Sequence, residues 1–321
     1  MTLPSSVIDL FMSRRTSTMS DNLFGVPGLD ARSHVVELRR SDRGTPLVCF
    51  PGSGGDPRIF CELAAALGES QSVYAINMEW LCRARGRFTV EQVAALYLDV
   101  VQSIKGAGPY CLCGYSFGGI VAYEIARLLQ EQGHRVAFVA LLDCPNPSLE
   151  ADLSPAASAE FRRAYLADRL GRYAHHLLRG DLRAFAGRAL AFLISRSSER
   201  LMPLIKAAFR IANRPLPAIV QSNDPGFLHA WKSYRPPSSS SDLVCFRIED
   251  RGAEHDRDPS MGWAGYTSGN IDVHVVPADH VGMMSAPSVN MIAETLSSCL
   301  RDSNSFGLAP GHSKKPLAPS G

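Results

Sequence analysis

The chain has 321 residues, of which 45% are hydrophobic and 20% charged, a balance typical of globular proteins with enough apolar material for a core. Its formal net charge of +2 argues against nucleic acid as a partner, because such binding needs a large positive excess. No apolar stretch approaches the ~18 residues of a membrane-spanning helix, and no secretory signal begins the chain. We therefore expect a cytoplasmic protein with neither nucleic acid nor membrane as a partner.

The two ends of the chain differ in composition from the part between them. Residues 1–33 have few apolar positions, and residues 302–321 are rich in Pro, Gly and Ser. Segments of this kind bury too little apolar surface to fold, so we expect a flexible leader and a disordered tail. Residues 34–301 are expected to form one folded domain.

Short apolar runs alternate with helical patterns in this domain. The runs predict strands at residues 34–40, 46–50, 72–77, 110–115, 136–143, 243–249 and 271–277. The helical patterns lie near residues 57–68, 89–105, 117–132 and 287–300. Several of the strands are apolar almost throughout, which is typical of a parallel sheet with helices on both faces. The alternation predicts an α/β fold with a mostly parallel, doubly wound sheet.

Residues 148–227 interrupt this alternation, because they contain helical patterns rich in Ala, Leu and Arg and no convincing strand. We expect a helical insertion that covers the carboxyl edge of the sheet as a lid. Within it, residues 158–214 hold eleven Arg and one Lys against two Asp and two Glu, a net charge of +8. A basic lid suits a substrate that carries phosphate or is delivered by an acidic protein, although a solvated helix face has the same composition.

The stretch "CLCGYSFGGIVAYEIARLL" contains the G-x-S-x-G pattern around Ser116. A buried-strand pattern precedes the serine and an amphipathic helix follows it, which is the strand, sharp turn and helix of a nucleophile elbow. Gly114 and Gly118 are expected there because a side chain at either position would collide with the neighbouring strand and helix. The pattern predicts that Ser116 is a catalytic nucleophile.

A serine nucleophile needs a base that is oriented by an acid, and in this fold the acid follows the serine while the base comes last. His280 lies in the loop after the last predicted strand, where the base is expected, and the other histidines fit this position less well. Two carboxylates are candidates for the acid. Asp143 ends one strand and Asp250 ends a later one, and their spacing does not decide between them.

The developing oxyanion needs two donors, and the backbone amide of Phe117 is the first candidate. The second is expected from the glycine-rich loop "PGSGGDP" after an early strand, through the amide of Ser53 or Gly52. A metal site is not expected, because the eight cysteines are scattered and the C-x-C pair at Cys111 has no partner cluster. Most cysteines lie in apolar runs and are expected to be buried thiols.

Taken together, residues from about 34 to 300 resemble the thioesterase domains that end nonribosomal peptide and polyketide assembly lines. The resemblance rests on the stretches "PLVCFPGSGG", "GPYCLCGYSFGGIVAYEIARLLQEQG", "VALLDCPNP", "YRP" and "VVPADHVGMM". It implies an α/β-hydrolase fold, with Ser116 as nucleophile, Asp143 as acid and His280 as base. It also implies no cofactor of the enzyme itself, since the substrate is an acyl or peptidyl chain on the phosphopantetheine of a carrier protein. The chain would be released by hydrolysis or macrocyclisation.

Other readings of the same residues remain open. Free-standing editing thioesterases, which clear stalled carriers, are similar but tend to use the later acid position. No carrier-domain motif precedes the domain, so we expect either a free-standing enzyme or a piece of a larger synthase. A general serine esterase, an acyltransferase and an inactive module that only docks carrier proteins are further alternatives.

Overall fold

The computed structural model of the chain describes residues 31–84, 87–106, 108–151, 225–249 and 258–305. They form a seven-stranded sheet in the order β1-β3-β2-β4-β5-β6-β7, in which β1 is antiparallel to β3 and the other neighbours are parallel. The strands are β1 (Val35–Arg39), β2 (Leu47–Phe50), β3 (Val73–Ile76), β4 (Tyr110–Tyr115), β5 (Val136–Leu142), β6 (Leu243–Ile248) and β7 (Ile271–Val276).

The central strands are the most apolar part of the sheet. Every residue of β2 and β4 is buried, as are the last five residues of β5. A strand with both faces covered needs apolar side chains on both faces, which explains the continuous runs in the sequence. All seven predicted strands are present, and the mostly parallel α/β arrangement is confirmed.

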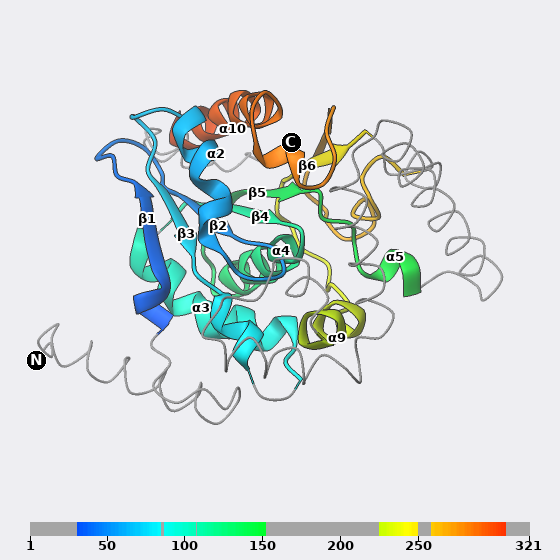
Figure 1. Ribbon diagram of the computed structural model, residues 1–321. Helices are drawn as coiled ribbons and strands as arrows, with labels where there is room; N and C mark the ends of the chain where they lie inside the picture. The colour runs from blue at the N-terminus through cyan, green and yellow to red at the C-terminus, as the bar shows by residue number, and fades with distance from the viewer. Residues whose placement is uncertain (1–30, 85–86, 107, 152–224, 250–257, 306–321) are drawn as a thin grey trace, which may run out of the picture.

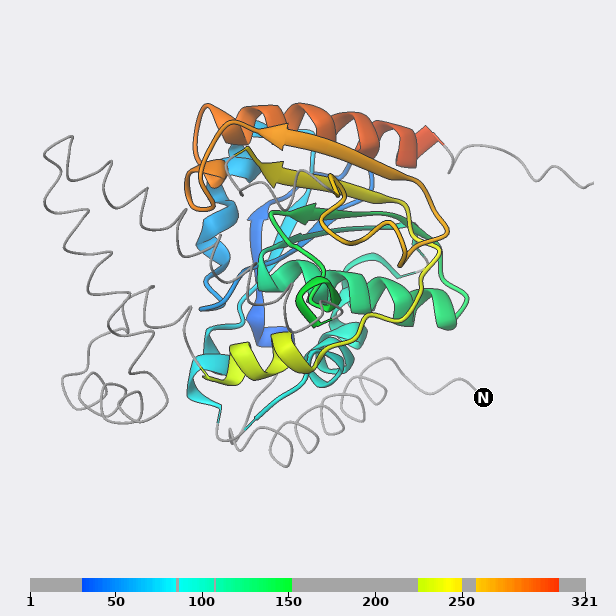
Figure 2. The same cartoon turned by 90° about the vertical axis from the view of Figure 1, so that its right-hand side faces the viewer.

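Helices cover the two faces of this sheet (Figures 1 and 2). One hydrophobic cluster joins one face to α3 (Val90–Lys105), α4 (Phe117–Glu131) and α9 (Pro225–Ser233). A second cluster joins the opposite face to α2 (Cys61–Ala66) and α10 (Ser288–Ser305). The core therefore has two layers, one on each side of the sheet.

The helix boundaries follow local sequence signals. Helix α3 begins at a capping box, in which the Thr89 and Gln92 side chains and main-chain amides pair with each other. Gly133, with φ of 80°, follows the end of α4, in agreement with the helical pattern near residues 117–132. Helix α10 runs to Ser305 and so extends past the expected domain boundary at residue 301. Its last turn continues because Ser303 packs inward and its hydroxyl donates to the Leu300 carbonyl at 2.8 Å.

The described part of the chain also contains shorter elements. They are η1 (Ala31–His34), η2 (Pro57–Phe60), η3 (Glu79–Arg83), η4 (Gly282–Met284) and α5 (Ser148–Ala151). Of these, η2 falls within the helical pattern predicted near residues 57–68 and α5 within the predicted helical insertion, while η1, η3 and η4 were not predicted. Most of the predicted leader, lid and tail lies outside the described residues. No helix in the described part of the chain is both long and apolar enough to cross a membrane.

Candidate active site

The turn between β4 and α4 holds Ser116 in a backbone conformation that L-residues rarely adopt, with φ of 53° and ψ of −122°. Hydrogen bonds fix this turn on both sides. The Ser116 amide donates to the Leu142 carbonyl at 2.9 Å, and the Gly119 amide donates to the Ser116 carbonyl at 2.9 Å. This is the geometry of a nucleophile elbow, which presents the serine side chain at the carboxyl edge of the sheet.

The glycines around Ser116 allow the backbone to pack at close range. A Cβ atom on Gly114 would overlap the main chain of Gly118, and one on Gly118 would overlap the carbonyl of Phe50 at the end of β2. This confirms the expectation that side chains would collide at both positions. As a consequence, the start of α4 rests directly on the segment that leads into the glycine-rich loop.

Asp143 lies directly after β5 and is fully buried, with φ of 46°. Its amide donates to the Phe246 carbonyl at 2.7 Å, and the Ile248 amide lies 3.5 Å from its Oδ1. Its other carboxylate oxygen, Oδ2, lies 2.5 Å from Nδ1 of His280. Two neighbouring strands thus orient the carboxylate toward the histidine.

His280 lies in the segment between β7 and α10, called here the base loop (residues 277–287), which includes η4. Its side chain is 40% exposed, and Nδ1 is engaged by Asp143, whereas Nε2 has no hydrogen bond to any residue that the structure describes. The imidazole stacks on the ring of Tyr115, with centroids 4.7 Å apart and planes inclined by 23°. Tyr115 immediately precedes Ser116, so the imidazole stacks on the residue next to the serine in the chain.

The glycine-rich loop (residues 51–56) follows β2 and adjoins the same serine. A Cβ atom on Gly52 would lie 3.2 Å from Cβ of Ser116 and 3.1 Å from the ring of Tyr115. The Gly55 amide donates to the Gly52 carbonyl at 3.0 Å and closes a tight turn that contains the half-buried Ser53. The loop therefore lies next to Ser116 in space. Phe117, the first residue of α4, follows Ser116 directly in the chain.

The end of the glycine-rich loop is fixed by an acidic cap. The Asp56 side chain accepts a hydrogen bond from the Arg58 amide at 2.9 Å, and the Arg58 guanidinium forms an ion pair with the same carboxylate at 2.7 Å. Hydrogen bonding to Arg58 lowers the pKa of Asp56 below its ordinary value of 3.8. The cap begins the short helix η2 at a fixed position relative to the loop.

Helix α9 contacts the elbow through an aromatic cluster that the sequence analysis missed. The Phe117 ring packs edge-on against Phe227, at 4.9 Å between centroids, and Phe88 packs against both. The hydroxyl of Tyr234, just after α9, donates to the buried carboxylate of Glu124 on α4 at 2.7 Å. Burial and Glu124 raise the pKa of this tyrosine, which keeps the hydroxyl protonated as a donor. An aromatic residue carries no sequence signal that names its partner in another helix.

Glu62 is a second residue that the sequence analysis missed. Its carboxylate accepts hydrogen bonds from the Ser285 hydroxyl at 3.1 Å and from the Ala286 amide at 3.0 Å. Glu62 lies on α2, which follows the glycine-rich loop by way of η2. It therefore ties the far end of the base loop to the element that follows the glycine-rich loop.

Three other expectations concern the acid, metals and cysteines. Asp250 lies outside the described residues. Among the residues that the structure describes, no group of three His, Cys, Asp or Glu side chains is arranged to hold a metal ion. Six of the eight cysteines are buried as expected, but Cys61 is exposed and Cys299 is half-buried, because both lie on helices that face solvent on one side.

The family model described as "Thioesterase domain" matches residues 45–300, which is most of the chain. The chain belongs to the thioesterase domain family. Malpinin synthetase of Mortierella alpina is 27% identical to this chain over 308 residues, which are 94% of the chain and 4% of the synthetase. The non-reducing polyketide synthase atnG of an Arthrinium species is 28% identical over 255 residues, 78% of the chain and 12% of the synthase. The chain thus spans a small part of these relatives.

Solved thioesterase structures share the fold of this domain. The Vlm2 thioesterase domain bound with a dodecadepsipeptide aligns with a TM-score of 0.55 at 18% identity, over 84% of this chain and 98% of that one. RedJ, a thioesterase from the prodiginine pathway of Streptomyces coelicolor, aligns with a TM-score of 0.53 at 21% identity, over 81% of this chain and 87% of that one. The α/β-hydrolase fold expected from the sequence is therefore confirmed.

Proposed function

We propose that this domain releases an acyl or peptidyl chain from a phosphopantetheinyl carrier protein through an ester on Ser116, in nonribosomal peptide or polyketide biosynthesis. The observation that carries the proposal is the 2.5 Å contact between His280 Nδ1 and Asp143 Oδ2, in a loop stacked on the residue before Ser116. The burial of Asp143 and the positive φ of Ser116 also support the proposal. Family membership supplies the thioester as the bond that this arrangement cleaves.

In the first half-reaction, Ser116 Oγ attacks the thioester carbonyl while Nε2 of His280 takes the hydroxyl proton. The tetrahedral intermediate collapses with cleavage of the carbon–sulfur bond, and the imidazolium returns the proton to the leaving thiolate. Asp143 stabilises the imidazolium and keeps Nδ1 protonated. The products are a free carrier thiol and an acyl ester on Ser116.

In the second half-reaction, His280 takes a proton from water, or from a hydroxyl or amine of the bound chain, as that group attacks the ester. The carbon–oxygen bond to Ser116 breaks, and the proton passes to Ser116 Oγ. An acid or a ring leaves, and the enzyme returns to its starting state. Both half-reactions use groups of this chain, the substrate and water, and neither step as proposed calls for a cofactor.

Two amides are proposed to hold the oxyanion of each intermediate. The amide of Phe117 belongs to the first residue of α4, where the helix dipole also favours negative charge. The amide of Ser53 or Gly52 would supply the second hydrogen bond, since Gly52 lies against Ser116. Each donor of this type contributes about 3–4 kcal/mol to the stabilisation of the transition state.

The carrier protein is the proposed partner. The +8 charge of residues 158–214 favours a phosphate-bearing arm and an acidic carrier surface, whereas the rest of the chain has a net negative charge. A general esterase would have no such need for charge complementarity.

Intact-mass spectrometry after mixing the protein with an acyl-phosphopantetheinyl carrier tests the proposal. We expect a mass gain of one acyl group on the wild type and none on Ser116→Ala, followed by release of an acid or a ring. Faster turnover of acetyl carriers than of long acyl or peptidyl carriers would instead favour the editing role. Labelling of Ser116 by a fluorophosphonate without acylation by any carrier would contradict the proposal and favour a general esterase that acts on free esters.

A further inference from the structure

Tyr115 is the residue between the glycine and the serine of the G-x-S-x-G pattern, and its side chain does not take part in the reaction proposed above. It is 92% buried, since its relative exposure is 8%. Its ring forms part of the core cluster between the sheet and helices α2 and α10. Tyr115 is the last residue of β4, and many residue types could occupy the end of a strand. The contacts that its side chain makes outside the strand therefore need a separate explanation.

Three contacts join Tyr115 to the parts of the proposed site. Its ring stacks on the imidazole of His280 at 4.7 Å between centroids, and its hydroxyl donates to the main-chain carbonyl of the same residue at 2.7 Å. The ring also adjoins Gly52, where a Cβ atom would lie only 3.1 Å away. The peptide bond to Ser116 is a further, covalent link. One side chain thus contacts the base and the glycine-rich loop, and its backbone carries the nucleophile.

The two contacts to His280 act on different degrees of freedom. The hydroxyl fixes the main chain of the base loop, and the ring fixes the plane of the imidazole. Asp143 alone leaves the imidazole free to rotate about its contact at Nδ1, because one hydrogen bond does not define the plane of a ring. Both contacts of Tyr115 remove that freedom, and catalytic rates fall steeply when a reacting group is displaced by about 1 Å.

We propose that Tyr115 is a positioning residue that holds His280 in the orientation from which Nε2 serves Ser116. The role of His280 as a base rests on the proposed function. The orientation of its imidazole depends only on the structure of the base loop and its contacts. It can therefore be measured without turnover.

The test compares Tyr115→Phe, which removes only the hydroxyl, with Tyr115→Leu, which also removes the ring. Tyr110→Phe is the matched control, because Tyr110 lies at the other end of β4, is buried, and also donates its hydroxyl to a main-chain carbonyl, that of Gly106. Thermal unfolding establishes that each variant is folded. Two quantities are then measured: the rate of Ser116 acylation by an acyl-phosphopantetheinyl carrier, and the nuclear magnetic resonance of the proton between His280 and Asp143, assigned by its loss in Asp143→Asn.

We expect Tyr115→Phe to lower the acylation rate constant about fivefold, the effect of one neutral hydrogen bond, with KM unchanged. Tyr115→Leu should lower it about 10²-fold and should broaden or remove the bridging proton resonance. Tyr110→Phe should match the wild type in both measurements. The inference is overturned if folded Tyr115→Leu keeps the resonance of the wild type.

The resonance separates this inference from the proposed function. If the wild type is not acylated but the resonance is lost in Tyr115→Leu and kept in Tyr110→Phe, the proposed function fails and the positioning role stands. If the wild type is acylated and the resonance is the same in all folded Tyr115 variants, the function stands and the positioning role is wrong.

Discussion

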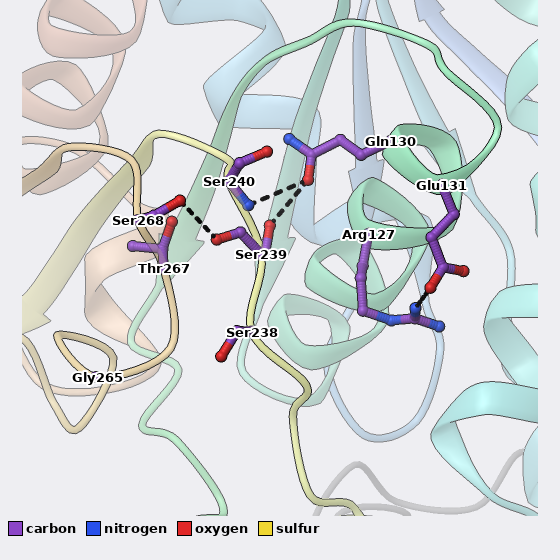
Figure 3. Close-up of a pocket in the computed structure, with 9 residues that line it drawn as sticks. All are labelled: Arg127, Gln130, Glu131, Ser238, Ser239, Ser240, Gly265, Thr267 and Ser268. Carbon is purple, nitrogen blue, oxygen red and sulfur yellow. Dashed lines mark hydrogen bonds and ion pairs between the residues drawn. The ribbon is translucent and has the colours of Figure 1, made fainter.

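The two edges of the sheet differ in how their backbone and polar groups are arranged. At the carboxyl edge, Ser116 and Asp143 adopt positive φ values, and glycines allow main chain to pack on main chain. At the amino edge lies a pocket of about 460 Å³ (Figure 3). It is lined by Arg127, Gln130, Glu131, Ser238, Ser239, Ser240, Gly265, Thr267 and Ser268.

The polar groups of this amino-edge pocket bind each other. Gln130 accepts hydrogen bonds from the Ser239 hydroxyl at 3.1 Å and the Ser240 amide at 3.3 Å, and Arg127 pairs with Glu131 (Figure 3). At the carboxyl edge, by contrast, the acid binds a half-exposed histidine whose second nitrogen faces no partner residue among the described hydrogen bonds. Positive φ values and a buried carboxylate bound to a half-exposed histidine therefore mark the candidate site better than the presence of a pocket does.

The largest expected effect comes from Ser116→Gly, which should change the acylation rate and the free energy of unfolding in opposite directions. Loss of the hydroxyl should lower acylation by about 10⁶-fold, the scale of removing a nucleophile. The same change should raise the free energy of unfolding by about 1 kcal/mol, because glycine tolerates the positive φ. Acylation assays and urea unfolding check both effects. Ser239→Ala in the amino-edge pocket is the control and should leave the acylation rate unchanged.

The next largest effect is expected for Asp143→Asn. Asparagine would donate to His280 or leave it in the wrong tautomer, so acylation should fall by about 10⁴-fold while the fold persists. Stopped-flow measurement of thiol release from an acyl carrier gives the rate. A loss of less than tenfold would show that another carboxylate, Asp250 among the candidates, orients the base.

The close backbone packing predicts a contrast in stability between two glycines. Gly118→Ala should destabilise the protein by about 3 kcal/mol, because the added methyl overlaps main chain that has no room to move. Gly265→Ala, in the wall of the amino-edge pocket, should change the free energy of unfolding by less than about 0.5 kcal/mol, since its Cβ would enter open space. Urea unfolding of both variants measures the contrast, and equal losses would contradict it.

The smallest effect concerns the cap of the glycine-rich loop. Arg58 lowers the pKa of Asp56 in the folded state, so this carboxylate contributes stability above its unfolded pKa and loses it as pH falls through the lower folded value. Asp56→Asn should therefore be less stable than the wild type at pH 7, and the gap should close below about pH 3.8, the ordinary value. Thermal unfolding between neutral and acid pH measures the gap. A gap that stays constant with pH would contradict the ion pair.

The sequence predicted the parts of the site that depend on local pattern. The elbow at Ser116 was predictable because strand, glycines and helix are adjacent in the chain, and chain order led from there to His280. The bond between His280 and Asp143 joins residues 137 positions apart, and from spacing alone Asp250 was an equal candidate.

The stacking on Tyr115, the carboxylate of Glu62 and the ring of Phe227 were not predictable from the sequence. Each depends on the path of a loop or helix through space. Their residue types are common in strands and helices with no such role. Positions of this kind become visible only when the packing of distant segments is known.

The packing of helix α9 against the elbow limits where this chain can be joined to another in a chimera. Phe227 packs on Phe117, and Tyr234 donates a hydrogen bond to Glu124, so α9 packs with the elbow although its first three residues fall within the predicted insertion. A chimera that exchanges the insertion to change substrate choice should therefore be joined before Pro225. A junction after Ser233 would replace α9 and with it the contact between Phe227 and Phe117. The turn that holds Ser116 would then lose part of its packing.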